Sequence, residues 1–586
     1  MDRASLRQHV LRALPWLAPA IVVAICGVAV ADALRKMTYA ILGRDQGIFL
    51  YVAWALEQRV RDYVDLREIN GPLTHVLHLA LLAAGGADEH VFRRLDVAFS
   101  SLVFFAIGSA LPGLAQSPSD SPPSWHLRAL WGFAGWAVLG AQYVVLDWWD
   151  TAQRESFYDL LLLASIGLQV HASRRTFASA RERAILWTAS GILGALTWFG
   201  KPTCILFSTL QSVATFFDRG DPTPRRARFA ALAAGWAVAS ATMTGYVLMR
   251  GDLLACIRIV LFETPPLYRP IWHKSIVAAY VLVGNAPKLN YAFATLVAVG
   301  ALAWRRKLPA RFYPLTALLV AGLFVFFLQA KGFPYHLHPV TAGTRLLWLG
   351  ALALASERFS AAGRPWQRAI PIAAAIAVGW QCRDDARLSS YARSDWDVAG
   401  ATKEKREGEA YVTRFVAEDF FPWDIRQAGD FLRKTTAASD RVQLYGMDPY
   451  VLFLARRLSA TPYIYSFELN VDASLLGGSG WRPDERERES IVRMAHRHAE
   501  EMQGALDTQP PAAFVIIDRM PFLRPPDSEV DFAEHCPVTY AWMSLRYRRA
   551  ERFGNVRVWL RNDLYAHASA AGDLHVVPSG IGDGPQ

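Results

Sequence analysis

The sequence predicts an α-helical polytopic membrane protein with a C-terminal α/β domain, and two observations support that fold class. Of the 586 residues, 53% are apolar and the mean hydropathy is +0.15, which is too apolar for one water-soluble domain. Residues 14–381 contain repeated apolar runs of roughly 17–22 residues, enough to span a bilayer core of about 30 Å. Residues 382–586 contain none. We therefore predict a membrane module over 1–381 and a soluble extracytoplasmic α/β module over 382–586.

The net charge of +10 indicates membrane topology rather than nucleic-acid binding. Basic residues gather in short loops between the apolar runs, and such loops stay on the cytoplasmic side of a membrane. The clusters are Arg3, Arg7 and Arg12; Arg174, Arg175, Arg181 and Arg183; Arg219, Arg225, Arg226 and Arg228; Arg305, Arg306, Lys307 and Arg311; and Arg358, Arg364 and Arg368.

Eleven spans place all these loops on one side if the N-terminus is cytoplasmic. The predicted spans are 14–34, 95–115, 128–146, 156–171, 184–200, 202–217, 229–248, 288–304, 312–329, 339–356 and 369–381. The first run has no small-residue cleavage site, so we expect a retained helix. Residues 72–86 are only about 15 residues long and would reverse every later loop. We therefore expect them to form a surface-lying helix of the first outer loop.

The C-terminal module alternates strand-like and helical segments. Strands are predicted at 441–446, 513–519 and 556–561, and Pro449 is expected to open a helix over YVLFLARRL. We expect a long helix within 472–510 and no order in the last twenty or so residues, which are rich in glycine. An α/β sandwich is the predicted architecture.

Motifs for nucleotide binding and metal binding are absent from the sequence. It has no Walker loop, no GxGxxG and no metal-spaced Cys/His cluster. Five cysteines are too few for a disulfide framework, although a pairing of Cys382 with Cys536 stays open.

The unusual polar residues instead fall on the same predicted extracytoplasmic side. Ionisable groups at membrane helix ends are costly unless they face a cavity or an anion, which marks these positions as a candidate site. They are Asp45 in GRDQG; Asp147, Asp150, Arg154 and Glu155 in LDWWDTAQRES; Lys201 in WFGKPT; Lys331 and His336 in KGFPYHLHP; and Arg258, Arg269, His273 and Lys274 in the loop 249–287.

The order and sidedness of these motifs resemble the GT-C superfamily of polyprenyl-phosphate-sugar-dependent glycosyltransferases, the group of protein mannosyltransferases and aminoarabinose transferases. The shared pattern is an acid after the first span, an amphipathic outer loop, an acidic turn before the fourth span, a Lys-Pro break and a large outer domain. In that domain, GMDPYVLFLARRLSATPYIY is similar to a segment common in bacterial members. The resemblance covers residues 1–381 as architecture.

The resemblance implies a bacterial inner-membrane enzyme of the cell envelope that transfers a sugar, with inversion, from a polyprenyl-phosphate donor. The acceptor, a glycan, lipid or protein, would enter from the outer side, and Asp45 would be the general base. The alternatives for Asp45 are an interfacial carboxylate or a partner of Arg44. Glu155 is the second candidate catalytic acid, and Arg154 would pair with it. Lys201, Lys331, His336 and Arg258 would join Arg154 in binding the donor phosphate. Lys201 and His336 could also be interface residues.

No cofactor or metal is required by this resemblance, although Asp147 and Asp150 could hold a divalent cation. One departure concerns the first loop, where aminoarabinose transferases carry Glu-Lys before Pro-Pro and this chain reads Ile69-Asn70-Gly71-Pro72. Two other functions remain open. A ligase using a polyprenyl diphosphate would need a denser cationic site, and a transporter would be expected to show internal repeats.

Overall fold

The computed structural model describes residues 3–115, 122–173, 179–217, 223–282, 284–360, 365–393, 402–478, 480–521 and 526–574. The chain forms two compact units, each built from separate stretches. Unit 1 comprises Met1–Leu42, Asn70–Met249 and His273–Ala401, and unit 2 comprises Gly43–Ile69, Arg250–Trp272 and Thr402–Gln586. The predicted division into functional modules 1–381 and 382–586 stays a prediction.

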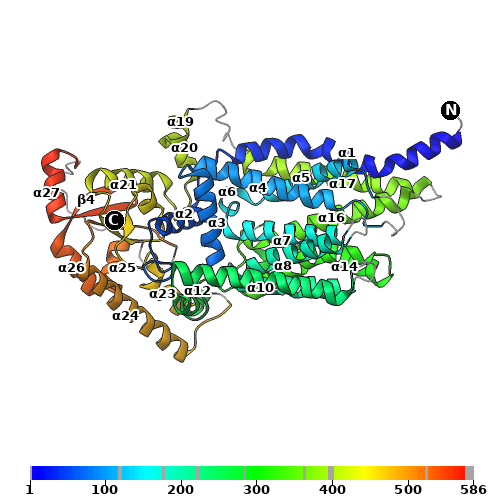
Figure 1. Cartoon of the computed structure of the whole chain (residues 1–586). Coiled ribbons are helices and arrows are strands. Elements are labelled where there is room, and N and C mark those ends of the chain that lie inside the picture. Colours follow the sequence, from blue (N-terminus) through cyan, green and yellow to red (C-terminus); the bar gives the residue numbers. More distant parts are fainter. Residues whose placement is uncertain are drawn as a thin grey trace. The chain divides into compact units, whose positions relative to one another are not determined.

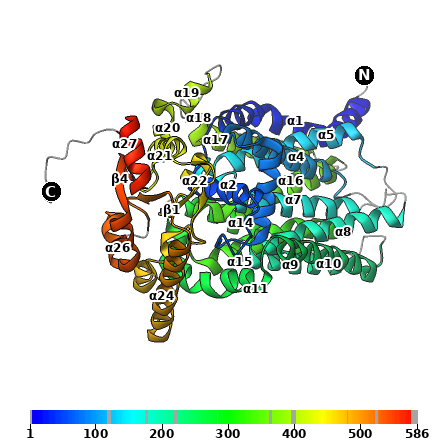
Figure 2. The ribbon, with the colours of Figure 1, turned by 60° about the vertical axis from the view of Figure 1, so that its left-hand side comes forward.

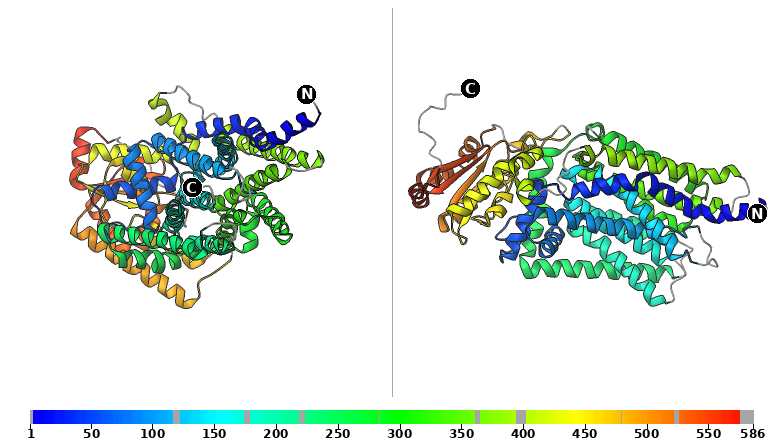
Figure 3. Two further views of the ribbon diagram at one scale, coloured as in Figure 1. Left: turned by 45° about the vertical axis from the view of Figure 1, so that its right-hand side comes forward. Right: turned by 90° about the horizontal axis from the view of Figure 1, so that it is seen from above.

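Unit 1 is a bundle of helices whose long members run roughly parallel to one another (Figures 1 and 3). Its α-helices are α1 (Arg3–Met37), α3 (Pro72–Gly85), α4 (Glu89–Ala110), α5 (Trp125–Val144), α6 (Asp147–Asp150), α7 (Arg154–Ala172), α8 (Ala180–Leu196), α9 (Ile205–Phe217), α10 (Arg225–Arg250), α13 (Ile276–Val281), α14 (Asn285–Trp304), α15 (Thr316–Gln329), α16 (His338–Ser360), α17 (Pro365–Leu388) and α18 (Ser390–Arg393). Short 3₁₀ turns are η1 (Thr197–Phe199), η2 (Pro202–Cys204), η4 (Ala310–Leu315) and η5 (Pro334–Leu337).

Each of the eleven predicted apolar runs lies mainly within one helix of this bundle, and the runs 184–200, 202–217 and 312–329 also include short 3₁₀ turns. Within the described residues, four segments are long and apolar enough to cross a membrane: Leu14–Met37, Arg225–Arg250, Asn285–Trp304 and Ala310–Gln329. The prediction of a polytopic α-helical membrane protein is therefore confirmed, whereas the count of eleven spans is not established by these four.

The short apolar run at 72–86 forms α3, which begins directly after Gly71 with proline in its first turn. Proline fits there because the first amide groups of a helix have no partner within the helix. In Figure 1, α3 runs across the direction of α4 and α7. Its predicted position on the membrane surface stays a prediction.

Helices of unit 1 approach each other closely where glycines face one another. A Cβ added to Gly135 of α5 would lie 2.6 Å from Cα of Gly108 in α4 and 2.7 Å from the Phe104 carbonyl oxygen. Likewise, a Cβ on Gly235 of α10 would lie 2.2 Å from the Thr188 carbonyl oxygen of α8. Small residues at such crossings let membrane helices pack by close backbone contact.

Unit 2 is built on a five-stranded mixed sheet of order β2-β1-β3-β5-β4, with helices packed around it (Figure 2). The strands are β1 (Arg441–Tyr445), β2 (Leu458–Ser459), β3 (Ala513–Ile517), β4 (Tyr547–Phe553) and β5 (Val556–Arg561). β1 pairs in parallel with β2 and β3, whereas β5 is antiparallel to β3 and β4.

The helices of unit 2 come from all three of its chain stretches. They are α2 (Arg44–Glu57), α11 (Leu253–Ile257), the π-helix η3 (Arg258–Glu263), α12 (Thr264–Trp272), α19 (Lys403–Glu407), α20 (Glu409–Val412), η6 (Thr413–Phe415), α21 (Pro422–Thr435), α22 (Tyr450–Ala455), η7 (Ser466–Glu468), α23 (Asp472–Leu476), α24 (Glu485–Thr508), α25 (Ser528–His535), α26 (Pro537–Arg546) and α27 (Asn562–Ala571).

The three predicted strands and the helix after Pro449 are confirmed as β1, β3, β5 and α22. The predicted long helix within 472–510 is confirmed as α24, and the short helix α23 precedes it. Two strands escaped prediction: β2 has two residues, and β4 carries four charged residues in YRRAERF. The C-terminal residues 575–586 and the basic residues Arg174, Arg175, Arg219 and Arg364 lie outside the described residues.

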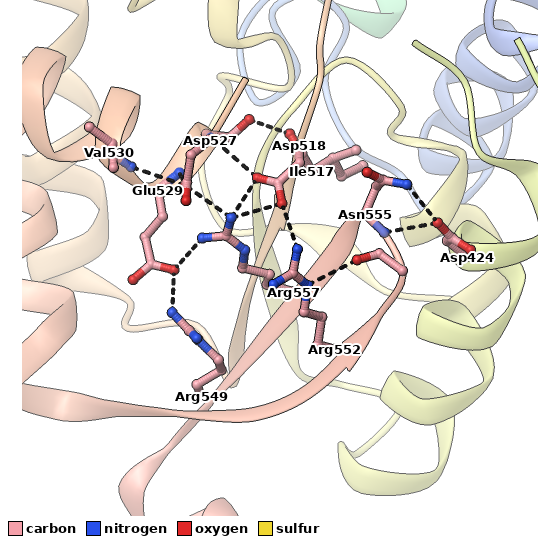
Figure 4. Close-up of polar contacts among 12 residues, drawn as sticks. Asp424, Ile517, Asp518, Asp527, Glu529, Val530, Arg549, Arg552, Asn555 and Arg557 are labelled. Carbon is pink, nitrogen blue, oxygen red and sulfur yellow. Dashed lines mark hydrogen bonds and ion pairs between the residues drawn. The ribbon is translucent and has the colours of Figure 1, made fainter. Parts of the chain in front are cut away.

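A charged network joins β5 to the segment after β3 in unit 2 (Figure 4). The Arg557 guanidinium donates to both carboxylate oxygens of Asp518, at 3.0 and 2.8 Å, and to Glu529 at 2.8 Å. Glu529 also accepts from Arg549 at 2.8 Å. At the β4–β5 turn, Asp424 accepts from the Asn555 amide at 2.9 Å. The charged side chains of this network are therefore paired with one another.

All five cysteines are free thiols in the structure. Cys382 belongs to unit 1 and Cys536 to unit 2, so the pairing that the sequence left open is not formed.

The α4–α5 crossing predicts that Gly135→Ala destabilises the bundle. The new methyl group would force the two backbones apart, and overpacking of this kind costs about 1–3 kcal/mol. The thermal unfolding midpoint of the protein in detergent should fall. Gly245→Ala in α10 is the matched control, because nothing lies within 4 Å of its added Cβ. Equal midpoints for the two variants would contradict close packing at Gly135.

Candidate functional site

Glu155, in the first turn of α7, is the centre of a buried polar cluster in unit 1. Its Oε1 accepts a hydrogen bond from Arg154 Nε at 2.9 Å and from Lys201 Nζ at 3.2 Å. His336 Nε2 lies 4.0 Å from the same oxygen. Glu155 and His336 are almost fully buried, with side-chain exposures of 4% and 2%. Lys331 also lies close enough for Arg154, Lys201 and Glu155 to shift its pKa. Five of the seven predicted site residues therefore gather here.

Local backbone chemistry places Lys201 beside Glu155. Lys201 sits between η1 and η2 and precedes Pro202, which favours the extended conformation that it adopts, with φ −146° and ψ 101°. A Cβ on Gly200 would lie 2.1 Å from the ring of Tyr158, so only glycine fits between this turn and α7. The Tyr158 hydroxyl lies 2.5 Å from the Thr74 hydroxyl of α3. The Lys-Pro break is therefore held against both α7 and α3.

A second helix break, after α15, carries Lys331 and His336. Ala330 ends α15 in the left-handed conformation at φ 50°, and Gly332 has φ 73°. The His336 ring packs edge-on against Tyr335, with centroids 4.5 Å apart. In addition, the Lys274 amide donates to the Ala330 carbonyl oxygen at 2.7 Å, which ties the 273–275 segment to this break. A left-handed turn thus redirects the chain so that these side chains reach α7.

The charges of this cluster change the ionisation of its members. Burial, together with the charges of Arg154 and Lys201 and against the opposing effect of Glu155, lowers the pKa of Lys331 to about 7. Burial, assisted by Lys201, Lys331 and Arg154, holds the pKa of His336 well below its usual value, so this imidazole is neutral. Arg154 and Lys201 both pair with Glu155, and Lys331 is a third basic group nearby, so the basic groups around this carboxylate suit an anion.

A cavity of about 40 Å³ adjoins this cluster and is lined by side chains of α7, α9, α15 and α16. Three predicted site residues line this cavity: Glu155, Lys201 and His336. Tyr158 and Asp159 also line it, but sequence reasoning missed them because both lie inside the apolar run of α7. Their one available signal was their spacing of three and four residues from Glu155, which places them on its face of the helix.

The other two predicted site residues, Asp45 and Arg258, belong to unit 2. Asp45 is half-buried in the first turn of α2. Arg258 is exposed, and its Nε lies 3.7 Å from Glu263 Oε1. Burial raises the pKa of Tyr465 well above its usual value, and the negative charges of Glu68 and Asp45 raise it further. Asp45 therefore lies near Tyr465 and Glu68.

The residue beside Asp45 joins two of the quoted motifs. Arg44 of GRDQG donates from Nε to Asp448 of GMDPY at 2.8 Å and from Nη1 to Asp419 at 3.2 Å. Gly47 also packs on Tyr450, where a Cβ would lie 2.8 Å from the tyrosine side chain. The GRDQG and GMDPY motifs are therefore in direct contact within unit 2.

A buried ion network holds the three stretches of unit 2 together. Arg67 donates to Glu263 at 2.6 Å and to Glu468 at 2.5 Å, and Arg497 donates to Glu263 at 2.7 Å. Burial, with Glu263 and Glu68 acting in the same direction against Arg67, raises the pKa of Glu468 to about 7. Sequence reasoning could not find this network, because Arg67 and Glu468, which pair in it, are 401 residues apart along the chain.

The departure at Asn70-Gly71 has a steric cause in unit 1. A Cβ on Gly71 would lie 2.2 Å from the Phe199 carbonyl oxygen of η1. No side chain fits there, so a lysine at position 71 of this chain would have no room.

Among the described residues, no group of three or more His, Cys, Asp and Glu side chains could hold a metal ion. Asp147 is instead in a strained turn with φ 72°, where its carboxylate accepts from the Trp148 amide and from Ser390, each at 2.5 Å. The prediction that no metal is required stays a prediction.

The helical bundle and the sheet-containing unit define an α-helical multi-pass membrane protein with a small α/β domain. The chain is similar to the crystal structure of ArnT from Cupriavidus metallidurans bound to undecaprenyl phosphate, at 12% identity and a TM-score of 0.51. The match covers 92% of this chain and 97% of that one. The apo structure of the same ArnT gives 12% identity, a TM-score of 0.52 and the same coverage. The predicted resemblance to the GT-C superfamily is thus confirmed as a likeness of fold.

An oligosaccharyltransferase from Archaeoglobus fulgidus also aligns, at 9% identity over 86% of this chain and 69% of that one. Its TM-score of 0.40 is too low to support an argument. No protein-family model matches the sequence, and no curated protein matches it.

The shared carboxylate predicts the outcome of Glu155→Gln. Arg154 and Lys201 would lose their buried counter-charge, which costs about 3 kcal/mol or more in such pairs, so the thermal unfolding midpoint should fall. Added inorganic phosphate should raise that midpoint more in the variant than in the wild type, because an anion replaces the missing charge. Asp65→Asn is the control, because it breaks only the surface pair with Arg61, whose side chain is 64% exposed. Equal phosphate effects in variant and wild type would contradict the electropositive cluster.

Proposed function

We propose that this protein is a membrane glycosyltransferase that moves a sugar from a polyprenyl-phosphate donor to an acceptor hydroxyl. The observation that carries the proposal is the gathering of Arg154, Lys201 and Lys331 around the carboxylate of Glu155. The fold supports it, because the similar ArnT structure is bound to undecaprenyl phosphate. A lipid phosphate is an anion that such a cluster would bind.

The cations would act on the leaving group. As the acceptor oxygen attacks the anomeric carbon, the bond from that carbon to the phosphate oxygen breaks and negative charge develops on the departing lipid phosphate. Preorganised positive groups in a water-poor site stabilise such charge strongly. Neutral His336 would donate one hydrogen bond from its ring to a phosphate or sugar oxygen. Glu155 would hold the cations in position between turnovers.

Asp45 would be the general base that takes the acceptor proton. An alcohol is a poor nucleophile, so a carboxylate must accept its proton during a single inverting displacement. A half-buried carboxylate at the start of α2 meets this chemical requirement. Arg258, exposed in unit 2, would add a phosphate contact in the same proposal.

The proposed setting is the bacterial inner membrane, with the N-terminus cytoplasmic and the reaction on the extracytoplasmic face. The distribution of basic loops in the sequence supports this orientation. The direct test is incubation of the purified protein with radiolabelled polyprenyl-phosphate sugars and envelope acceptors. Label should move from the lipid to an acceptor fraction, and label that stays on every lipid offered would overturn the proposal.

Asp45→Asn should abolish sugar transfer while leaving donor affinity unchanged. The amide keeps the size of the side chain but cannot accept a proton, and loss of a general base costs about 10²- to 10⁴-fold in rate. Transfer rate and donor Kd are measured together. Asp65→Asn, the same substitution in the same chain segment at a surface ion pair, is the control. Transfer at the normal rate in Asp45→Asn would remove this residue from the role of base.

Lys331 should make donor binding depend on pH. Its pKa is about 7 in the free protein, and a bound phosphate anion must raise that value. The protonated form therefore binds the donor more tightly, so affinity should fall as pH rises from 7 to 9, by at most about tenfold per unit.

The test of this pH dependence is Kd for undecaprenyl phosphate measured across pH 7 to 9. Lys331→Gln should bind more weakly at pH 7 and lose most of the slope. Lys434→Gln, an exposed position in α21, should keep the wild-type slope. Parallel curves for wild type and Lys331→Gln would show that this ammonium does not contact the phosphate.

A further inference from the structure

A second cavity, of about 300 Å³, opens in unit 1 among α5, α14, α16 and α17. Its polar lining includes Gln142, Lys288, Arg345, Gln381 and Asp385, and Tyr291 and Trp348 supply aromatic surface. The cavity shares no lining residue with the one beside Glu155. The proposed sugar transfer uses none of these side chains.

Helix α16 separates the two cavities. Thr341, Arg345 and Trp348 face the larger cavity and are spaced four and three residues apart, which puts them on one side of a helix. Pro339, two residues before Thr341, faces the smaller cavity. Residues two apart on a helix point to nearly opposite sides, so the larger cavity is a distinct site.

Two almost fully buried side chains present polar atoms without partners among the described residues. Arg345, which is 8% exposed, pairs through Nη2 with Asp385, while its Nη1 has no hydrogen bond. Gln142, which is 1% exposed, donates from Nε2 to Thr341 at 2.8 Å, while its Oε1 accepts none. Unsatisfied buried groups of this kind cost free energy unless a ligand meets them.

The lining of the cavity contains two basic side chains, Lys288 and Arg345, and one acidic side chain, Asp385. Asp385 already accepts from Arg345 and, at 3.0 Å, from Gln381, whereas Asp150 and Asp147 act on Lys288 from outside the lining. The Arg345 guanidinium also lies over the Trp348 ring, 4.3 Å from its centroid, which fixes its orientation. The cavity therefore offers basic donors, Lys288 and Nη1 of Arg345, to an anion and one acceptor, Oε1 of Gln142, to a hydrogen-bond donor.

We propose that this cavity binds the headgroup of an anionic phospholipid that carries hydroxyl groups, of the phosphatidylglycerol type. The phosphodiester would accept from Lys288 and from Nη1 of Arg345, and a headgroup hydroxyl would donate to Oε1 of Gln142. A lipid is the source that this location favours, because α14 is one of the helices able to cross a membrane. The site is independent of sugar transfer and is tested without turnover.

The experiment is native mass spectrometry of the full-length protein in mild detergent, titrated separately with phosphatidylglycerol, phosphatidylcholine and glycerol 3-phosphate. Phosphatidylglycerol should bind most tightly. Lys288→Gln should weaken its binding about tenfold, the effect of one charge-assisted hydrogen bond, and leave phosphatidylcholine unaffected. Lys307→Gln, at an exposed position, is the matched control for general charge attraction and should bind as the wild type does. Arg345 is left intact, because its loss would strand Asp385 without its partner.

Gln142→Leu tests the hydroxyl contact. It should weaken phosphatidylglycerol binding and leave binding of phosphatidic acid, which lacks the headgroup hydroxyls, unchanged. Glycerol 3-phosphate that binds as tightly as the lipid would support the anion site and assign it a water-soluble occupant. Equal binding of phosphatidylglycerol and phosphatidylcholine, or wild-type phosphatidylglycerol affinity in Lys288→Gln, would overturn the proposal. Neither result would bear on the proposed sugar transfer.

Discussion

The polar chemistry of unit 1 depends on one buried carboxylate. Burying charges costs several kcal/mol per ion unless close partners offset the loss of water. Glu155 provides that partner for Arg154 and Lys201 and moderates the loss of charge on Lys331. One carboxylate is enough to keep these side chains together in the fold, yet too little to neutralise them. The remaining positive charge would favour an anion over a cation at this site.

Cations reach this carboxylate because two helices end early. A backbone interruption among membrane helices is tolerated only where protein or a polar cavity satisfies its freed groups. Here Gly200 and Pro202 lie between α8 and α9, and Ala330 and Gly332 follow the end of α15. Each break presents a lysine, and each is tied to a neighbouring segment: Gly200 packs on Tyr158, and Ala330 accepts from the Lys274 amide. Each break is therefore anchored to a neighbouring segment.

Much of this arrangement could be predicted from the sequence, because charge sorts helix ends by side. That rule brought Arg154, Glu155, Lys201, Lys331 and His336 to one predicted surface, and the structure gathers these five in unit 1. It could not find Tyr158 or Asp159, since a polar residue within an apolar run has no topological signal. Nor could it foresee that Gly71 lies against a backbone carbonyl, or that β4, with four charges in seven residues, pairs as a strand. Those features depend on packing between segments far apart in the chain.

The same reasoning clarifies what positions Asp45 within unit 2. An acid at the start of a helix is favoured by the helix dipole, but that effect fixes neither its direction nor its surroundings. Its neighbour Arg44 does so by binding Asp448 and Asp419, and Gly47 adds a close contact with Tyr450. With α2 held on two sides of its first turn, rotation about its axis would break a buried ion pair. The GMDPY segment therefore acts as the support of α2, which gives the C-terminal domain a positioning role in the orientation of the candidate base.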